Sequence, residues 1–200
     1  MDFDDLVVPK APPQSRASKA NAEHEHHLYE GAVMLAFAMH LLRTEPTSEV
    51  CIHPDGEHGK QFDFTGWLER RGFSLQERMG KTSYGGRYRD KEGRVIVINP
   101  KSGQGDVKAK VGGEMLSAEC KGGIINTKHC GQVSRLRRGL CEAVGLLMDT
   151  PPAQGRQVAV VPYTEVTCRL ANCMALRCAS VGIEIALVKS RGEVIYVKSR

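Results

Sequence analysis

The last quarter of the sequence constrains the fold most, because it alternates between strand and helix patterns. Val158-Ala159-Val160-Val161 is an uninterrupted apolar run, which is typical of a strand covered on both faces. The expected elements are a strand over 157–161, a helix over 164–180 that stops at Gly182, and strands over 183–188 and 194–197. A strand, helix and strand in this order predict an α/β fold.

Periodicity upstream predicts the rest of a mixed central β-sheet flanked by helices. The expected elements are helices over about 21–43, 62–71 and 132–148, strands over 73–78 and 95–98, and a hairpin of strands 106–111 and 115–121. Residues 49–59 are rich in turn-forming residues and are expected to be loop. Residues 80–94 are polar and glycine-rich, and Asp90-Lys91-Glu92-Gly93 is expected to form a hairpin turn that leads into the strand over 95–98.

A chain of 200 residues suits one domain. Residues 1–20 contain Ala11-Pro12-Pro13-Gln14-Ser15 and predict a flexible N-terminal tail, because this stretch has no apolar periodicity. Residues 21–200 are expected to form the single domain, in which residues 21–60 are an N-terminal helical extension.

Charge and cysteine content suggest a compartment and a partner. No apolar run approaches the roughly 20 residues of a membrane-spanning helix, and the acidic start lacks a secretory signal. The seven cysteines are therefore expected to be reduced thiols in a cytoplasmic protein. Residues 51–200 hold 24 basic and 15 acidic side chains, a balance of +9. This positive charge favours a polyanionic partner such as nucleic acid. A surface that is charged only for solubility is an equally weighted alternative.

The hairpin carries the most informative group of charged residues. Side chains alternate between the faces of a strand, so Glu119 and Lys121 project from one face. Asp106 begins the first strand and is expected to meet Glu119 across the hairpin. Two carboxylates suit a hard divalent cation such as Mg²⁺, and the backbone carbonyl of Cys120 is a candidate third ligand.

Asp106 and Glu119-Cys120-Lys121, followed by Gly122-Gly123, resemble the motif of the PD-(D/E)xK nuclease superfamily, which has the restriction-endonuclease-like fold. The resemblance implies a core of helix, three strands, helix and strand, which we expect over about residues 62–161. It also implies Mg²⁺, replaceable by Mn²⁺, at Asp106 and Glu119, with Lys121 assisting the attacking water. One residue departs from the motif: Gly105 stands where the family has proline.

The helix after the motif is expected to face the same site. The family often places a glutamine or a basic residue of this helix beside the metal, and Gln132 is the candidate here. Arg135, Arg137 and Arg138 can bind phosphates of the nucleic acid backbone, with Arg135 and Arg138 the favoured pair. For each arginine, a solvated helix face is an equally weighted alternative.

Other candidates stay open at this point. The family commonly adds a carboxylate from a helix, and the sequence does not choose between Glu30 and Glu69. His129 is a weaker candidate for proton transfer. The cysteines at 168, 173 and 178 repeat every five residues, which spreads them around a helix, so they are expected to be buried packing residues and not a metal site.

The sequence therefore predicts a magnesium-dependent nuclease, an endonuclease on DNA, of the kind used in restriction, phage defence or repair. The alternative from another class is a catalytically inactive nucleic-acid-binding or assembly subunit of the same fold. A plainer alternative is that Glu119 and Lys121 form a solvated strand face with no chemistry. A homodimer or a partner subunit is compatible with either function.

Overall fold

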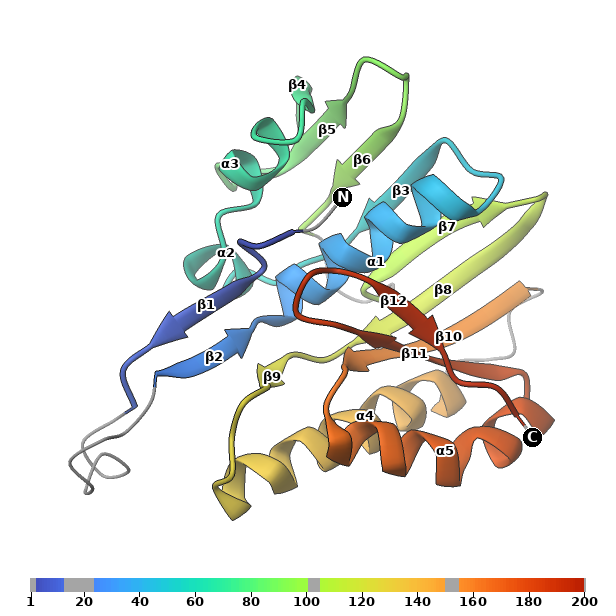
Figure 1. The fold of residues 1–200 in the computed structure, drawn as a ribbon. Helices are drawn as coiled ribbons and strands as arrows, with labels where there is room; N and C mark the ends of the chain where they lie inside the picture. Colours follow the sequence, from blue (N-terminus) through green and yellow to red (C-terminus); the bar gives the residue numbers. More distant parts are fainter. Residues whose placement is uncertain (1–2, 13–23, 101–104, 150–154, 200) are drawn as a thin grey trace.

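A computed structural model describes residues 3–12, 24–100, 105–149 and 155–199. The described chain is an α/β structure with a large mixed sheet flanked by helices and a small second sheet (Figure 1). The helices are α1 (Glu30–Thr44), α2 (His58–Gln61), α3 (Phe64–Glu69), α4 (Cys130–Asp149) and α5 (Glu165–Ser180). The strands are β1 (Val7–Lys10), β2 (Glu25–Leu28), β3 (Glu49–Ile52), β4 (Ser74–Arg78), β5 (Gly86–Arg89), β6 (Val95–Ile98), β7 (Val107–Val111), β8 (Glu114–Cys120), β9 (Gly123–Ile124), β10 (Gly155–Pro162), β11 (Ile183–Val188) and β12 (Val194–Tyr196).

The large sheet has nine strands in the order β12-β11-β10-β8-β7-β3-β6-β5-β4. The β7–β8 pair is antiparallel, whereas β10 is parallel to both β8 and β11. The small sheet has the order β1-β2-β9, with antiparallel pairs throughout. We call this small sheet the ribbon. The chain passes from β8 into β9, so the ribbon begins where the hairpin of the large sheet ends.

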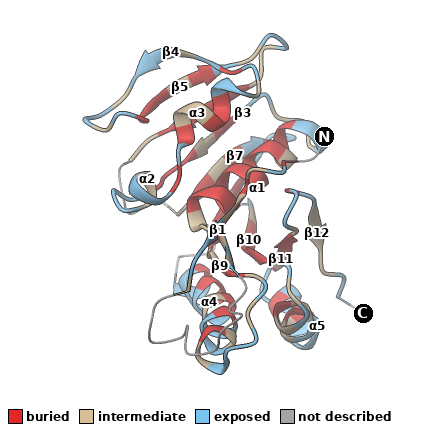
Figure 2. Ribbon diagram, turned by 60° about the vertical axis from the view of Figure 1, so that its left-hand side comes forward, coloured by how far each residue is buried: buried red, intermediate tan, exposed pale blue. Residues whose placement is uncertain are grey.

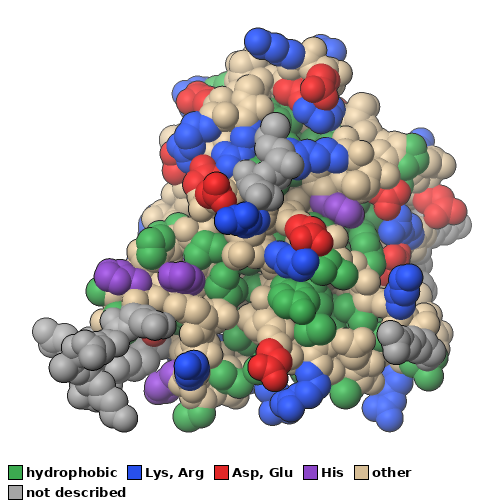
Figure 3. Space-filling view, viewed as in Figure 1, with side chains coloured by type: hydrophobic (Ala, Val, Ile, Leu, Met, Phe, Trp, Pro, Cys, Tyr) green, Lys and Arg blue, Asp and Glu red, His purple; other side chains and the backbone are tan. Residues whose placement is uncertain are grey.

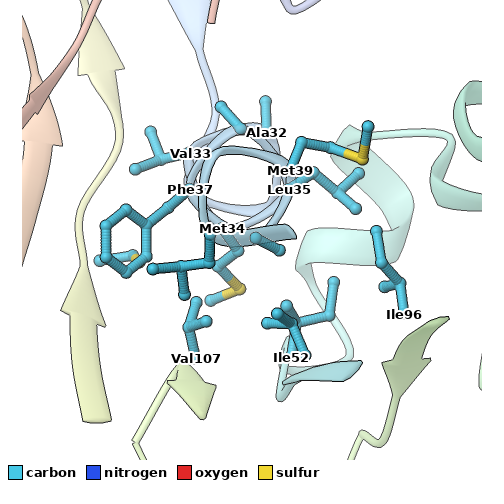
Figure 4. Close-up of a cluster of buried hydrophobic side chains, with 14 of the residues drawn as sticks. Ala32, Val33, Met34, Leu35, Phe37, Met39, Ile52, Ile96 and Val107 are labelled. Carbon is cyan, nitrogen blue, oxygen red and sulfur yellow. The ribbon is translucent and has the colours of Figure 1, made fainter. Parts of the chain in front are cut away.

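The core under one face of the large sheet is built around α1. Every residue of this helix from Gly31 to Met39 is buried, which is the pattern of a helix enclosed by protein. Figure 4 shows the helix end-on, with Met34 and Phe37 toward the sheet residues Val107 and Ile52. The short helix α3 adds Phe64, Trp67 and Leu68 to the same apolar cluster.

The opposite face is covered by α4 and α5, whose buried side chains pack on β10 and β11. Along β10, Val158 and Val160 belong to the cluster under α1, whereas Ala159 and Val161 belong to the cluster under α4 and α5. In Figure 2 this strand is buried, while α4 and α5 each keep an exposed side. The prediction of a strand covered on both faces is confirmed.

The β7–β8 hairpin closes through Gly112-Gly113, between the paired residues Val111 and Glu114. Both glycines have positive φ, 57° and 98°. Two successive positive φ values characterise a type I′ turn, which matches the twist of the two strands and fixes their register. The predicted hairpin is therefore confirmed, as are the strands at 73–78, 95–98, 157–161, 183–188 and 194–197 and the helices at 62–71, 132–148 and 164–180, each within a few residues.

The helix predicted over 21–43 is wrong at its start. The helix begins at Glu30, and Glu25–Leu28 form β2, which pairs with β1 and β9. Helical spacing continued into this segment by chance, whereas the contacts that make it extended come from strands 15 or more residues away in the chain. Pairing between distant segments leaves no local signal.

The predicted tail and extension are also corrected. Val7–Lys10 form β1, and Phe3 and Leu6 are buried in the main core, so residues 3–10 belong to the domain; residues 13–20 lie outside the described residues. Residues 49–52, expected to be loop, form β3 at the centre of the large sheet. Within residues 24–60, β2, α1 and β3 are thus built into the domain and are not an extension of it, whereas residues 21–23 lie outside the described residues.

The described residues contain no helix that is both long and apolar enough to cross a membrane. All seven cysteines are free thiols. Cys178 is buried as expected, but Cys173 is exposed, so uniform burial of the three cysteines in α5 is wrong.

Candidate functional site

Asp106 is fixed between two strands, directly before β7. Its backbone N–H donates to the carbonyl of Ala118 at 3.0 Å, and its own carbonyl accepts from the N–H of His53 at 2.8 Å. The carboxylate oxygen Oδ2 accepts from the N–H of Cys120 at 2.7 Å. The register pairs Val107 with Ala118, so Asp106 lies opposite Glu119 one step further along the hairpin.

Gly105 explains the departure from the family motif. Its φ is +78°, and a Cβ at this position would lie 3.2 Å from Oε1 of Glu119 and 3.0 Å from Oγ of Ser117. Proline fixes φ near −65° and cannot adopt this backbone. The same proximity shows that the Glu119 carboxylate reaches toward the residue before Asp106, and the strand register sets the two acids opposite each other.

Lys121 is held differently from our expectation. Its Nζ lies 3.5 Å from Oε1 of Glu30 and 3.3 Å from Oε1 of Glu142, so its ion pairs are with acids of α1 and α4. The stem of the lysine runs along α4 at Gly139, where a Cβ would be 3.3 Å from Cβ of Lys121. The ammonium group is thus placed by two helices, beside the two strand carboxylates.

Gly122 brings α1 to the hairpin. A Cβ at this position would lie 2.5 Å from the backbone N of Glu30 and 2.7 Å from the carbonyl oxygen of Leu28. Both neighbours are backbone atoms, which have little freedom to move aside. The glycine after the E-x-K element therefore permits the contact that sets Glu30 next to Lys121. Of the two candidate helix acids, Glu30 lies next to Lys121, whereas Glu69 is exposed at the end of α3.

His58 is a site residue that the sequence analysis missed. Its Nδ1 lies 3.1 Å from the backbone N of Asp55, and its Nε2 lies 3.5 Å from Oε1 of Glu30. Asp55 Oδ1 lies 3.3 Å from the same Nδ1. The available signal was an aspartate followed three residues later by a histidine in a turn, which alone is too common to indicate a site.

The carboxylates are crowded and partly buried, and this changes their acidity. Burial raises the pKa of Asp106 to about 6, partly opposed by the N–H of Cys120. Burial and then the charge of Asp106 raise the pKa of Glu119 to about 7, and burial also raises that of Glu30. Burial alone would lower the pKa of Lys121, but its acidic neighbours outweigh it and raise that pKa. The site holds more negative charge than one lysine balances.

Asp106 and Glu119 are the side chains here that could hold a divalent cation. Within the described part of the chain, no three His, Cys, Asp or Glu side chains converge as ligands. Magnesium needs only one or two protein carboxylates, since water and phosphate complete its shell. The thiol of Cys120 is fully buried in the main core, so only its backbone is left for the site.

The residues predicted on α4 divide into two groups. Gln132 is buried and Arg135 is exposed. Both line a pocket that Glu30 also lines. Arg137 and Arg138 are exposed on the outer side of the helix. His129 is exposed, and its Nδ1 accepts from the N–H of Gly131 at 3.2 Å, which is a contact local to the start of α4.

Comparison of the chain with protein-family models, with curated proteins and with solved structures found no match. The residues and their geometry are therefore the basis for a function.

Proposed function

We propose that this protein is a magnesium-dependent nuclease that hydrolyses phosphodiester bonds of DNA. The observation that carries the proposal is that Asp106 and Glu119 lie opposite each other on adjacent strands, with Lys121 two residues after Glu119 and its ammonium 3.5 Å from Glu30. This is the grouping that the resemblance to PD-(D/E)xK nucleases implies. The grouping depends on contact between the hairpin and α1. If Glu119 and Lys121 were only solvent-exposed charges on a strand, this contact would not be needed.

The metal would be held by Asp106 and Glu119, with the backbone carbonyl of Cys120 and Glu30 as further candidate ligands. When bound, a magnesium ion supplies a more acidic water and neutralises charge that develops on the phosphate. The excess of carboxylate charge in the site supports this assignment, because a divalent cation would relieve it.

The remaining groups have roles that follow from their positions. Hydrolysis needs a water oxygen to bond to phosphorus while the bond to the leaving oxygen breaks, and negative charge grows on both sides. Lys121 can hydrogen-bond to the attacking water and offset that charge. Gln132 can orient water or phosphate from α4. His58 positions Glu30, and Glu30 in turn fixes the lysine.

Two features support the rest of the proposal. The helix α1, the strands β3, β7 and β8, the helix α4 and the strand β10 follow the order of a restriction-endonuclease-like core, and these four strands are neighbours in the sheet. In this assignment the core begins with α1, before residue 62. The strands β4, β5 and β6 come between β3 and β7 in the chain, but in the sheet they lie beyond β3. Arg135 and Arg138, exposed on α4, can bind backbone phosphates.

The test is cleavage of supercoiled plasmid by the purified chain in Mg²⁺ or Mn²⁺, compared with Asp106→Ala and Lys121→Ala. We expect nicking by the natural chain and a loss of about 1,000-fold or more in both variants. Lys110→Ala is the matched control, because Lys110 is an exposed lysine on the same hairpin.

Cleavage that survives both site substitutions would overturn the assignment of the site. A chain that binds plasmid but cleaves neither DNA nor RNA in either metal would instead favour the inactive nucleic-acid-binding subunit.

A further inference from the structure

A pocket of about 350 Å³ opens directly beside the proposed metal site. Glu30, which pairs with Lys121, and Gly122, which follows Lys121 in the chain, line this pocket. Its other walls come from β2, β9, α2 and the first turns of α4, so it lies between the ribbon and the helices α2 and α4. We call it the ribbon pocket. Figure 3 shows histidine side chains grouped over the β1–β2 part of the ribbon, on the side that the view presents.

One wall of the ribbon pocket is aromatic. The rings of His27 and Tyr29 are stacked with centroids 5.3 Å apart, and both residues line the pocket. The ammonium of Lys10, from β1, lies 5.0 Å from the centroid of the Tyr29 ring. Stacked rings beside a cation form the kind of surface on which nucleic acid bases stack.

The other walls offer polar donors and an apolar floor. Gln61 of α2 and Gln132 of α4 present side-chain amides, and Arg135 presents a guanidinium. Amides hydrogen-bond to base edges, and a guanidinium binds phosphate. Leu28, Ile124 and Leu136 line the floor and are buried, which suits the face of a base.

The size and position of the pocket select the form of the substrate. Its volume is at the small end for ligand pockets, which span roughly 300–1,000 Å³, and suits one nucleotide. A base that is paired and stacked within a duplex cannot enter such a concave pocket unless it leaves the stack. A nucleotide bound there would be joined to the phosphate at Glu119 and Lys121 by its own backbone.

We propose that the ribbon pocket binds an unpaired nucleotide, so that the preferred substrate is a strand with an unpaired nucleotide next to the phosphate that is cleaved. This inference rests on the proposed nuclease function for the position of the phosphate. The recognition itself, by aromatic stacking and amide donors, is common to DNA and RNA strands.

The experiment measures binding by fluorescence anisotropy in EDTA, which removes metal and prevents cleavage. The probes are short labelled single strands of DNA and of RNA and a blunt DNA duplex of the same length. The variants are Tyr29→Ala, Tyr29→Phe and Gln61→Ala. Tyr163→Ala is the control outside the pocket: Tyr163 is an exposed tyrosine that, like the half-buried Tyr29, has a lysine ammonium near its ring, that of Lys189 at 5.9 Å.

We expect Tyr29→Ala to weaken binding of a single strand about 10-fold, as for the loss of one stacked base. Tyr29→Phe keeps the ring and should retain the affinity, and Tyr163→Ala should change nothing. Blunt duplex binding should be the same for all variants. Gln61→Ala should weaken single-strand binding several-fold, and it tests the pocket independently if Tyr29→Ala does not fold.

Several outcomes overturn the inference: single-strand affinity that is unchanged in both Tyr29→Ala and Gln61→Ala, equal losses for strand and duplex, or no binding of single strands by the natural chain. A separate cleavage assay in Mg²⁺ distinguishes this failure from failure of the proposed function. Cleavage of blunt duplex that does not depend on Tyr29 would support the nuclease function and contradict nucleotide binding in the ribbon pocket. Binding that depends on Tyr29 without any cleavage would support nucleotide binding in the pocket and contradict the nuclease function.

Discussion

The candidate site has two halves that are built in opposite ways. The hairpin half consists of Asp106, Glu119 and Lys121, which lie within 16 residues of one another in the chain. The ribbon half consists of Lys10, Tyr29, Glu30 and His58, which arrive from β1, the start of α1 and α2. The first half is held by the ladder of one hairpin, and the second by tertiary contacts between segments far apart in sequence.

This difference separates what carries the chemistry from what selects and positions the substrate. The hairpin half contains the strand acids that would bind a metal, and a two-residue glycine turn fixes their register. The ribbon half contains the aromatic wall and the helix acid, and it approaches the hairpin half closely at Gly122. Substitutions that act on one half and not on the other therefore test whether the division is real.

The largest effect is expected where the halves join. In Gly122→Ala the new methyl group would overlap the backbone of Leu28 and Glu30, so we expect a loss of about 3 kcal/mol in the free energy of unfolding. Gly145→Ala is the control, because no atom lies within 4 Å of a Cβ there. That exposed helical position should gain about 0.5–1 kcal/mol. Equal stability of the two variants in urea unfolding would show that the halves are not in close contact.

The second prediction concerns the negative charge that Glu30, in the ribbon half, places next to Lys121 of the hairpin half. Glu30→Gln keeps the shape of the side chain but removes the ion pair with Lys121, and we expect kcat/KM for cleavage to fall about 100-fold. Glu69→Gln replaces an exposed glutamate on α3 and should leave cleavage unchanged. Equal activity of both variants would remove Glu30 from the site.

The third prediction concerns pH in the absence of metal. Folding raises the pKa of Glu119 from 4.5 to about 7 and the pKa of Asp106 from 3.8 to about 6. Between the ordinary and the raised pKa of each group, the folded chain therefore binds more protons than the unfolded chain. Stability should therefore fall as pH rises from about 4.5 to 7, by about 2 kcal/mol after allowance for solvent screening. Lys121, whose pKa is raised from 10.5, contributes only at higher pH.

Thermal unfolding at pH 5 and pH 8 measures this effect. Glu119→Gln should flatten the pH dependence, and added Mg²⁺ should raise the melting temperature more at pH 8 than at pH 5. A metal-free chain with the same stability at both pH values would contradict the crowding of carboxylates in the hairpin half.

The smallest effect is expected from His58, which acts through Glu30. His58→Ala should weaken Mn²⁺ binding, measured by calorimetry, about 10-fold. His58→Asn keeps a donor toward Glu30 and should restore part of that affinity, which a merely structural histidine would not show. His129→Ala, at an exposed histidine of α4, is the control. If all three variants bind Mn²⁺ alike, His58 has no positioning role.

The same division explains which parts of the fold were predictable. Elements with a strong local pattern, such as the Val158–Val161 strand, α5 and the glycine turn of the hairpin, were predicted from sequence. β1, β2 and β3 were not, because short strands made extended by distant partners have no periodicity of their own. Residues 25–28 were absorbed into the neighbouring helix for this reason.

The candidate site follows the same rule. Asp106 and Glu119 were predicted to meet because a hairpin brings its ends together. The ion pairs of Lys121 with Glu30 and Glu142, and the contact of His58 with Glu30, depend on how helices pack against the sheet. The sequence shows glycines at positions 122 and 139. Only the three-dimensional structure shows that Gly122 leaves room for the backbone of α1 and Gly139 for the side chain of Lys121.

The enclosure of α1 has a consequence for how this protein can change over evolutionary time. A helix with protein on every side has no room to slide or turn, so its first residue is presented at one fixed place. Variation in the reach or charge of that acid must therefore come from substitution at position 30 itself. A shift of the helix itself would require new side chains throughout the centre of the molecule.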